Sequence, residues 1–404
     1  MKKICLVTAG IFLSLFASFA QTTPKDSTQY KSRKLTFEEA NLVSSYYKQD
    51  GNNSAVTGGI GTEKLTDISN SIDLKFIRWD KRNRKHTLDA EIGFDHYTSA
   101  SSDNVNPNTM SGASHADTRI YPSLNWSMEN EKKGSTFGAG VSFSTEFDYQ
   151  SFGVNLLFAQ KTKNRSGEFT AKFQAYLDKL KYILPYELRQ NGGGGGGGDD
   201  DEDDYPSKSR NSFSGSLSYS QIINQRLQIM FIADLIHQQG YLGLPFHRVY
   251  TDNNTVLVEN LPSTRLKIPL GFRANYFLGD KLVLRSFYRY YKDDWGLAAH
   301  TVQLESSIKI TPFFSLTPFY RYYTQTAVDY FAPVYVHKTS EEYFTSNYDL
   351  SKFNSNFYGA GFRISPPKGI LGIKRLNMLE LRYGHYSRNN GMKSDIISLN
   401  LKIK

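Results

Sequence analysis

Residues 261–331 read LPSTRLKIPLGFRANYFLGDKLVLRSFYRYYKDDWGLAAHTVQLESSIKITPFFSLTPFYRYYTQTAVDYF. Between Leu266 and Tyr276 the apolar side chains fall at every second position. After a break at 278–280 the alternation resumes, and it recurs twice more. A period of two predicts strands with one apolar and one polar face. The charged members of the polar face are Arg285, Arg289, Glu305 and Arg321. A sheet that is apolar outside and charged inside is typical of a transmembrane barrel.

The N-terminus has the three parts of a secretory signal peptide. Two lysines precede an apolar run from Ile4 to Phe16, and small residues precede a cleavage point between Ala20 and Gln21. The run is shorter than the roughly 20 apolar residues that cross a membrane, so we expect cleavage rather than an anchor. The only cysteine, Cys5, would leave with the signal, and the mature chain would carry no disulfide and no cysteine metal site.

The rest of the chain is rich in aromatic residues and has no long apolar run. The sequence has 27 Tyr and 27 Phe. Nothing after the signal is long and apolar enough for a membrane helix. A secreted chain of this kind is either a large soluble β-protein or an outer-membrane barrel with aromatic girdles. The formal net charge is +9, but acidic and basic residues are interleaved, so we expect no nucleic-acid partner.

The alternating pattern continues through most of the chain and predicts about 16 strands, with a range of roughly 14–18. Connections after even-numbered strands are short, and every long loop follows an odd-numbered strand. Bacterial barrels place short turns in the periplasm and longer loops outside the cell. A soluble sandwich would not predict this alternation. We therefore predict an all-β protein, a transmembrane antiparallel up-and-down β-barrel of the outer membrane with short periplasmic turns and longer extracellular loops.

The expected domains are a signal peptide at 1–20, a periplasmic N-terminal lead at 21–41 and the barrel at 42–404. In the lead, Thr36–Glu39 matches a capping box, and a helical turn and an extended chain remain alternatives there. A low-complexity loop at 191–205 interrupts the barrel. It joins the glycines Gly192–Gly198 to the acidic run Asp199–Asp204, and we expect a solvated loop rather than a calcium or phosphate site.

The polar faces of three successive strands, with the residues at their ends, form the candidate site. If Asp294–Gly296 is a tight connection, Arg285 lies opposite Glu305. One interpretation is a charged constriction or a site for an anionic ligand, because arginine suits carboxylate and phosphate. The other is a structural ladder that fills the lumen, and both remain open. The lumen candidates are Arg285, Arg289, Tyr291, Asp293, Asp294, Trp295, Glu305, Arg321, Tyr323 and Gln325.

The loop from Gly240 to Ser263 begins with apolar and aromatic residues, unlike a solvated surface loop. We expect it to fold inward or to pack on the barrel wall. Its candidates, with one from the strand that follows, are Tyr241, Pro245, His247, Arg248, Glu259 and Arg265. No GxSxG motif and no HxH or HxxxH pair is present, so we predict no enzymatic activity, no metal and no cofactor.

Residues 240–331 also carry a series of ordered motifs. They are Gly240-Tyr241-Leu242, Pro245, His247-Arg248-Val249, Glu259, Pro262, Arg265, Tyr288-Arg289-Tyr290-Tyr291, Asp293-Asp294-Trp295, His300, Arg321-Tyr322-Tyr323-Thr324-Gln325 and Asp329-Tyr330. In these motifs the sequence resembles an uncharacterised bacterial family of predicted outer-membrane β-barrels, known only as a domain of unknown function. The resemblance implies a fold and a location but no activity. Relatives are often encoded near thioredoxin-like and flavin-transferase proteins, which implies a redox or maturation pathway.

The expected function is a channel, or an export or uptake pore, with an Arg/Tyr-rich lumen. The alternative is a non-conducting barrel that acts as the docking or maturation partner of a periplasmic or surface protein, and an outer-membrane enzyme comes third. The expected partners are outer-membrane lipid, the barrel assembly machinery during biogenesis, and that periplasmic or surface protein.

Overall fold

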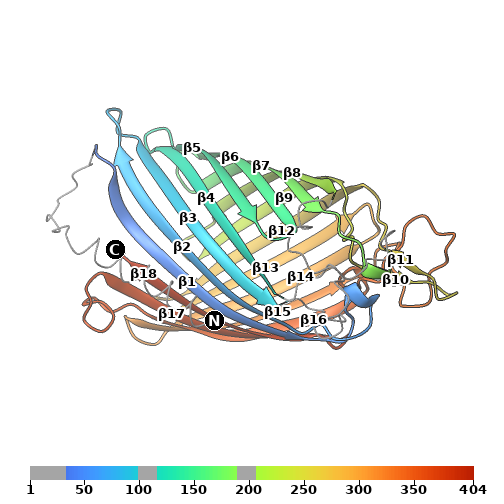
Figure 1. Cartoon of the computed structure of the whole chain (residues 1–404). Coiled ribbons are helices and arrows are strands. Elements are labelled where there is room, and N and C mark those ends of the chain that lie inside the picture. Colours follow the sequence, from blue (N-terminus) through green and yellow to red (C-terminus); the bar gives the residue numbers. More distant parts are fainter. Residues whose placement is uncertain (1–32, 99–115, 189–205) are drawn as a thin grey trace.

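The computed structural model describes residues 33–98, 116–188 and 206–404, which form one antiparallel barrel (Figure 1). Sixteen strands of this part of the chain close into a ring in which the first strand pairs with the last. The predicted barrel and its strand number are therefore confirmed. The ring strands are β1 (Thr36–Asp50), β2 (Leu65–Trp79), β3 (Lys85–Thr98), β4 (Ala116–Asn130), β5 (Ser135–Thr145), β6 (Tyr149–Lys161), β7 (Gly167–Lys181), β8 (Ser207–Ile222), β9 (Leu227–Gly240), β12 (Thr264–Leu278), β13 (Leu282–Asp293), β14 (Ala298–Lys309), β15 (Phe314–Gln325), β16 (Phe353–Ile364), β17 (Leu376–Arg388) and β18 (Lys393–Ile403).

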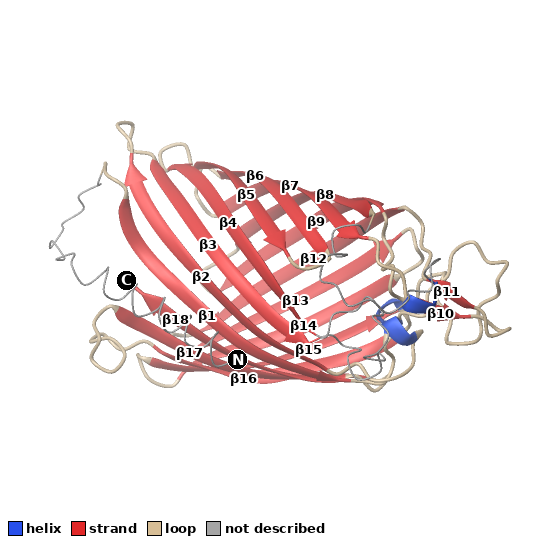
Figure 2. Ribbon diagram, in the orientation of Figure 1, coloured by secondary structure: helices blue, strands red, loops and turns tan. Residues whose placement is uncertain are grey.

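The remaining elements are short and lie in the loops at one end of the barrel (Figure 2). Strands β10 (Arg248–Tyr250) and β11 (Val256–Val258) pair with each other as a separate hairpin. The single-turn helices are η1 (Ala55–Thr57), η2 (Tyr186–Leu188) and η3 (Tyr348–Leu350). In the described ranges, no helix has the length and apolar character that crossing a membrane requires.

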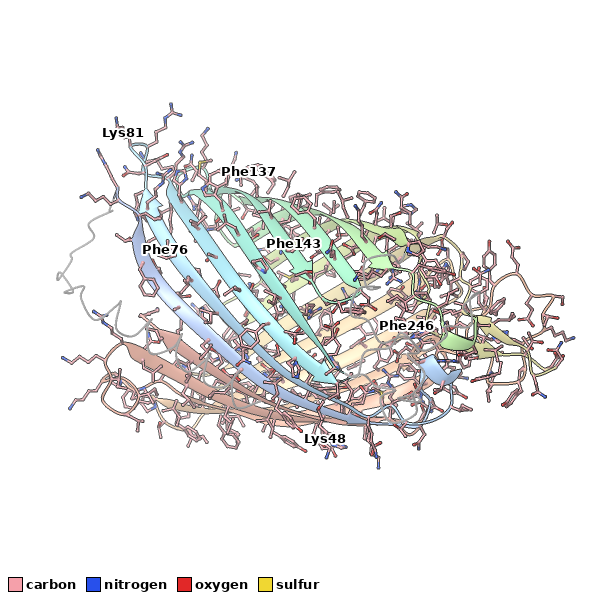
Figure 3. All side chains as sticks on the ribbon, in the orientation of Figure 1. Lys48, Phe76, Lys81, Phe137, Phe143 and Phe246 are labelled. Carbon is pink, nitrogen blue, oxygen red and sulfur yellow. The ribbon has the colours of Figure 1, made fainter. Side chains whose placement is uncertain are left out.

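The outer wall of the ring is apolar. Leu304 on β14 keeps 57% of its surface exposed, and comparable side chains recur around the ring. Figure 3 labels Phe137 and Phe143, two of these exposed residues on β5. Further examples, one from each of seven other strands, are Ile92, Leu124, Leu156, Phe173, Leu217, Phe231 and Leu381. Such a continuous apolar surface is unstable in water and fits lipid, so the barrel spans the outer membrane.

Connection length alternates between the two ends, as predicted. One end carries the turns 80–84, 131–134, 162–166, 223–226, 279–281, 310–313 and 365–375, and the other end carries all the long loops, among them 51–64, 241–263 and 326–352. Lys81 lies at the first end and Phe246 at the second (Figure 3). Short turns face the periplasm and long loops face the outside in bacterial barrels, so the second end is the extracellular mouth. The low-complexity loop at 191–205 lies outside the described residues.

The predicted start of the barrel is wrong, because β1 begins at Thr36 and not at Leu42. The capping-box segment is strand and not a helical turn. The Thr36 hydroxyl donates to the carbonyl of Ile77 (3.1 Å). The Glu39 carboxylate lies between Lys75 on β2 (3.1 Å) and Lys402 on β18 (2.8 Å). The two strands that flank β1 therefore use the polar groups that would have capped a helix. The predicted lead at 21–41 thus overlaps β1, and the predicted signal peptide lies outside the described residues.

Placing arginine on the lipid-facing wall should destabilise the barrel. Leu304→Arg is expected to lower the free energy of unfolding by about 2–4 kcal/mol, because the charge must enter hydrocarbon. Gln303→Arg, one position along on the inner face, should change it by much less. Urea titration of protein folded into vesicles, read by heat-modifiable mobility on gels, measures both. Equal losses for the two variants would mean that the outer wall of β14 does not face lipid.

Candidate functional site

Three extracellular loops meet over the mouth of the barrel. They are 51–64, 241–263 and 326–352, and we call them together the cap. The first joins β1 to β2 and the second joins β9 to β12, and six ring strands separate these two pairs on either side. Even so, Arg248 Nη1 donates to the carbonyl of Val56 (2.7 Å) in a buried contact. A contact between loops from opposite walls requires the chain to cross the mouth.

Two glycines allow the loops to approach closely. Gly58 has φ +76°, and a Cβ there would lie 2.4 Å from the ring of Tyr250. Gly59 has φ +85°, and a Cβ there would lie 2.7 Å from the carbonyl oxygen of Ser346. A larger residue would be strained in backbone conformation and would also clash. Loop 51–64 therefore fits against both of the other cap loops only because it carries these glycines.

A buried carboxylate joins the second and third cap loops. Glu259 accepts hydrogen bonds from the Thr345 hydroxyl (2.5 Å) and the Leu244 amide (2.9 Å), and its Oε2 lies 3.4 Å from His247 Nδ1. Burial alone would raise the pKa of Glu259, but the His247 charge and these donors together lower it. Arg248 in the same loop forms an ion pair with Glu187 (2.5 Å) from the loop after β7. We predicted that loop 241–263 folds inward or packs on the barrel wall, whereas these buried contacts join it to other loops.

The Asp-Asp-Trp motif closes the tight connection between β13 and β14. Buried Asp293 accepts two hydrogen bonds from Arg265 (2.9 and 2.5 Å) and one from the Tyr291 hydroxyl (2.8 Å). Its other oxygen accepts the backbone amides of Trp295 (3.1 Å) and Leu297 (3.0 Å). The guanidinium of Arg265 also lies over the Trp295 ring, 4.3 Å from its centre. These groups are hydrogen-bond partners of one another, and together they fix the connection between β13 and β14 at the base of the cap.

The lumen arginines have a different environment. Arg285 pairs with Glu305 in register (2.7 Å), which confirms the predicted alignment. Arg382 from β17 reaches the second oxygen of Glu305 (3.0 Å), and Arg289 pairs with Asp234 on β9 (3.2 Å). The side chains of Arg285 and Arg289 nevertheless stay 47% and 44% exposed, although they point into the ring. They line the lumen without filling it.

The other predicted strand residues form local contacts. Arg321 lies 4.9 Å from the ring centre of Phe357. The Tyr323 hydroxyl donates to Gln325 (2.6 Å). Gln325 is buried and donates to two backbone carbonyls of loop 326–352 (3.0 and 2.6 Å). The top of β15 is therefore attached to the cap, whereas Arg321 faces the lumen.

The remaining predicted residues also belong to the mouth. Asp294 accepts the backbone amide of Leu266 (3.0 Å). Tyr241 packs edge-on against Tyr182 with ring centres 5.3 Å apart, and Pro245 is fully buried. The structure thus divides the candidates into a cap set, held by mutual contacts, and a lumen set that faces the inside of the ring.

Charge is separated across the lumen. Strands β2–β4 lie opposite β12–β14, with five ring strands between them on either side. Inward positions of β2–β4 carry seven acidic and three basic residues, a formal charge of −4, whereas those of β12–β14 carry two acidic and six basic residues, a formal charge of +4. The acidic wall has Asp67, Asp73, Asp89, Glu91, Asp95, Asp117 and Glu129 with Lys75, Lys85 and Arg119, and the basic wall has Arg265, Lys267, Arg273, Arg285, Arg289 and Lys309 with Asp293 and Glu305.

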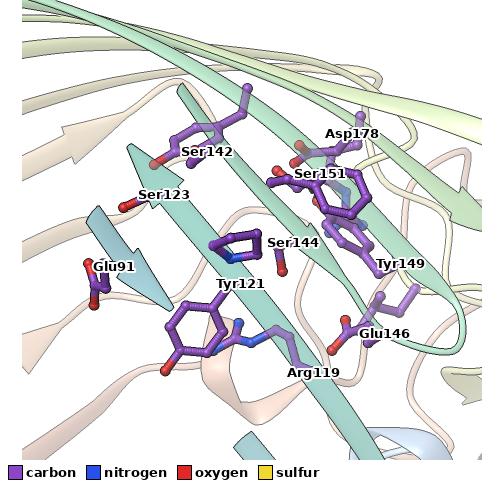
Figure 4. A pocket seen from close by; sticks show the side chains of 15 residues that line it. Glu91, Arg119, Tyr121, Ser123, Ser142, Ser144, Glu146, Tyr149, Ser151 and Asp178 are labelled. Atoms are coloured by element: carbon purple, nitrogen blue, oxygen red, sulfur yellow. Dashed lines mark hydrogen bonds between the residues drawn. The ribbon is translucent and has the colours of Figure 1, made fainter. Parts of the chain in front are cut away.

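A pocket of about 570 Å³ lies on the inner face of the wall from β3 to β8, next to the cap residue Leu244 (Figure 4). Its polar lining includes Glu91, Arg119, Tyr121, Glu146, Tyr149, Asp178 and Arg210. Burial raises the pKa of Glu146, which lies in the extracellular turn between β5 and β6, and the nearby carboxylates Asp148 and Asp117 add to this effect. In residues 33–98, 116–188 and 206–404 no group of histidine, cysteine and acidic side chains is arranged to hold a metal ion.

None of the residues that line this pocket was among the site residues predicted from the sequence. The sequence does carry a signal here, because Asp89, Glu91 and Asp95 fall at alternate positions of β3 and share its polar face. The distinctive motifs of residues 240–331 lie on other strands of the ring and in the cap. The pocket also combines strands that are distant in sequence, and their common wall follows only from the closed topology.

Comparison with known proteins identifies a family. The profile of a family described as "Protein of unknown function (DUF3570)" matches residues 17–393. No curated protein matches the sequence.

Similar solved structures include a mutant ferric enterobactin receptor from Pseudomonas aeruginosa (12% identity, 87% of this chain, 53% of that chain, TM-score 0.45). A siderophore receptor from Acinetobacter baumannii gives 10% identity, 88% and 53% coverage and a TM-score of 0.45. A BenF-like porin from Pseudomonas fluorescens Pf-5 gives 9% identity, 93% and 100% coverage and a TM-score of 0.43. The chain spans about half the length of the two receptors. None of the three is named as an enzyme, and likeness at this level carries no functional inference.

Acid should loosen the cap. The pKa of Glu259 is lowered in the folded cap, so its ionised carboxylate stabilises the cap at pH values above the ordinary pKa of 4.5. This contribution to stability is lost as the pH falls through the lowered pKa. Emission from Trp295 at the base of the cap, in a Trp79→Phe, Trp126→Phe background, should stay constant from pH 7 to about 5 and shift to the red in stronger acid. Glu259→Gln should be red-shifted already at pH 7, whereas Asp252→Asn, in the same loop, should behave like its parent. A red shift on raising the pH would contradict this assignment.

Proposed function

Because the chain belongs to the DUF3570 family, whose description assigns no function, we propose from the geometry that it is an outer-membrane channel with a water-filled lumen and a cap over its extracellular mouth. The observation that carries the proposal is the exposure of Arg285 and Arg289 inside the ring. Side chains packed in a filled interior would be almost fully buried. A ring of sixteen strands is also wide enough to leave an aqueous passage.

The charge separation supports a pathway for polar solutes. A net formal charge of −4 on one wall faces +4 on the other across a lumen with low-dielectric surroundings. Such an arrangement produces a transverse field that orients and concentrates charged or dipolar solutes. The cap then determines when solute enters, because its loops cross the mouth. Within the basic wall, Arg265 and Asp293 pair with each other at the base of the cap, and the other members belong to the permeation pathway.

Because the cap loops cross the mouth, a second function is also a candidate. A barrel that its own loops close permanently would be a non-conducting docking or maturation partner for a periplasmic or surface protein. The two proposals differ in whether the cap opens. The barrel assembly machinery remains a proposed partner during biogenesis in either case. The absence of enzymatic activity remains a prediction.

Removing a lumen arginine should change ion selectivity. Arg289→Ala deletes one of six positive charges on the basic wall and is expected to raise the permeability ratio of K⁺ to Cl⁻ by roughly twofold. Lys81→Ala removes the same charge from a periplasmic turn and should change the ratio much less. Reversal potentials of open events in planar bilayers, recorded under a KCl gradient, measure both. Wild-type bilayers that never conduct, or identical ratios for wild type and Arg289→Ala, would count against the proposal.

A further inference from the structure

The pocket beside the acidic wall contains a buried carboxylate with an unused oxygen. Asp178 on β7 is only 8% exposed. Its Oδ2 accepts the Tyr149 hydroxyl (2.5 Å), but Oδ1 has no hydrogen-bond partner among the described residues. Leaving a buried acceptor unpaired costs free energy, and native structures rarely do so without a reason. A ligand that brings an N–H or O–H donor would supply the missing partner.

Two other carboxylates line the same pocket. Glu91 on β3 makes no hydrogen bond or ion pair within the described part of the chain. Glu146 accepts only the Tyr97 hydroxyl (2.6 Å) there. These side chains and Asp178 come from different sides of the pocket (Figure 4). Glu91 and Oδ1 of Asp178 therefore offer acceptors that no hydrogen bond in the described part of the chain uses.

The two guanidinium groups of the pocket differ in availability. Arg210 is engaged, because it donates to the backbone carbonyls of Tyr241 (2.9 Å) and Gly243 (2.5 Å) and so attaches the cap loop to β8. Arg119 donates through Nε and Nη2 to one oxygen of Asp95 (3.1 and 2.5 Å). Its side chain remains 45% exposed, and Nη1 makes no hydrogen bond to the described residues. Nη1 of Arg119 is therefore a positively charged donor that is available to a ligand.

The space between these groups is lined by hydroxyls. Figure 4 places Ser144 and Ser151 between Arg119 and Asp178, with Tyr149 beside them. Register places Ser144 next to Ser151 and Ser151 next to Asp178 across β5, β6 and β7. The volume of about 570 Å³ is within the usual range for a small-molecule site. A ligand there meets an acceptor at one end, a cation at the other and neutral polar groups between them.

We propose that this pocket binds a small zwitterion of dipeptide size, with its ammonium group against Asp178 and its carboxylate against Arg119. The inference rests on the proposed function in one respect, since the solute must reach the lumen through an opened cap. It extends that function by naming the substrate class. The transverse field acts in addition, because it favours solutes that carry both charges.

Binding is tested with four probes of similar size. Diglycine carries both charges, N-acetyl-diglycine lacks the amine, diglycinamide lacks the carboxylate, and glucose carries hydroxyls alone. Ligand-observed NMR titration of the full chain in detergent micelles measures each Kd. Diglycine should bind roughly tenfold more tightly than either singly charged probe, because each loses one charge-assisted contact. Glucose should bind more weakly still.

Substitutions in the pocket test which side chains contact the ammonium group of the ligand. Asp178→Asn keeps the acceptor for Tyr149 and should weaken diglycine binding roughly tenfold while leaving N-acetyl-diglycine unchanged. Glu91→Gln should produce a smaller loss of the same kind and provides a second test if the first variant does not fold. Glu129→Gln, near the periplasmic turn and paired with Lys161 (2.9 Å), is the matched control. Heat-modifiable mobility verifies folding in each case.

The outcomes distinguish this inference from the channel proposal. Diglycine binding with the expected variant pattern supports the site even if bilayers show no conductance, in which case only the channel proposal fails. Equal affinities for diglycine and N-acetyl-diglycine would overturn the site, and so would no binding at all or a preference for glucose. An Asp178→Asn protein that folds and binds like Glu129→Gln would also overturn it, whatever the conductance.

Discussion

The pairing of β1 with β18 is the constraint on which the rest of this structure depends. Hydrocarbon offers no hydrogen bonds to an exposed strand edge, so a sheet that spans a membrane must close on itself. Glu39 illustrates the closure, because one carboxylate contacts lysines from both neighbouring strands, Lys75 and Lys402. Once the ring is closed, every second side chain faces lipid and the others face the lumen. Closure with sixteen strands also determines which walls face each other.

Which walls of the ring face each other determines both the charge separation across the lumen and the contacts within the cap. The acidic wall of β2–β4 faces the basic wall of β12–β14 only because five strands separate them on each side. In the same way, the loops after β1 and β9 start from opposite sides and meet through Arg248 and the carbonyl of Val56. The cap is therefore a structure of the whole ring. The cap is stable only if its buried charged groups have partners, as Glu259 does in Thr345, because an unpaired buried charge costs free energy.

Much of the fold could be predicted from the sequence, because period-two alternation determines which face each side chain occupies. A tight connection at 294–297 then determined the register, and Arg285 does lie opposite Glu305. The start of β1 could not be predicted in this way. The capping-box pattern at Thr36–Glu39 is local, whereas the cations that bind Glu39 lie 36 residues away on Lys75 and at the far end of the chain on Lys402. The roles of the site residues could not be predicted from the sequence either. The contact between Arg248 and Val56 spans 192 residues, and no periodic pattern in the sequence indicates it.

We propose that the cap closes a water-filled lumen because its loops cross the mouth from opposite walls. Single-channel recording of a chain in which residues 241–263 are replaced by a short Gly/Ser turn between β9 and β12 tests it most directly. We expect wild type to be closed for most of the recording and the shortened chain to show a large, steady conductance. The same closed state in both proteins, with the shortened barrel shown to be folded, would contradict it.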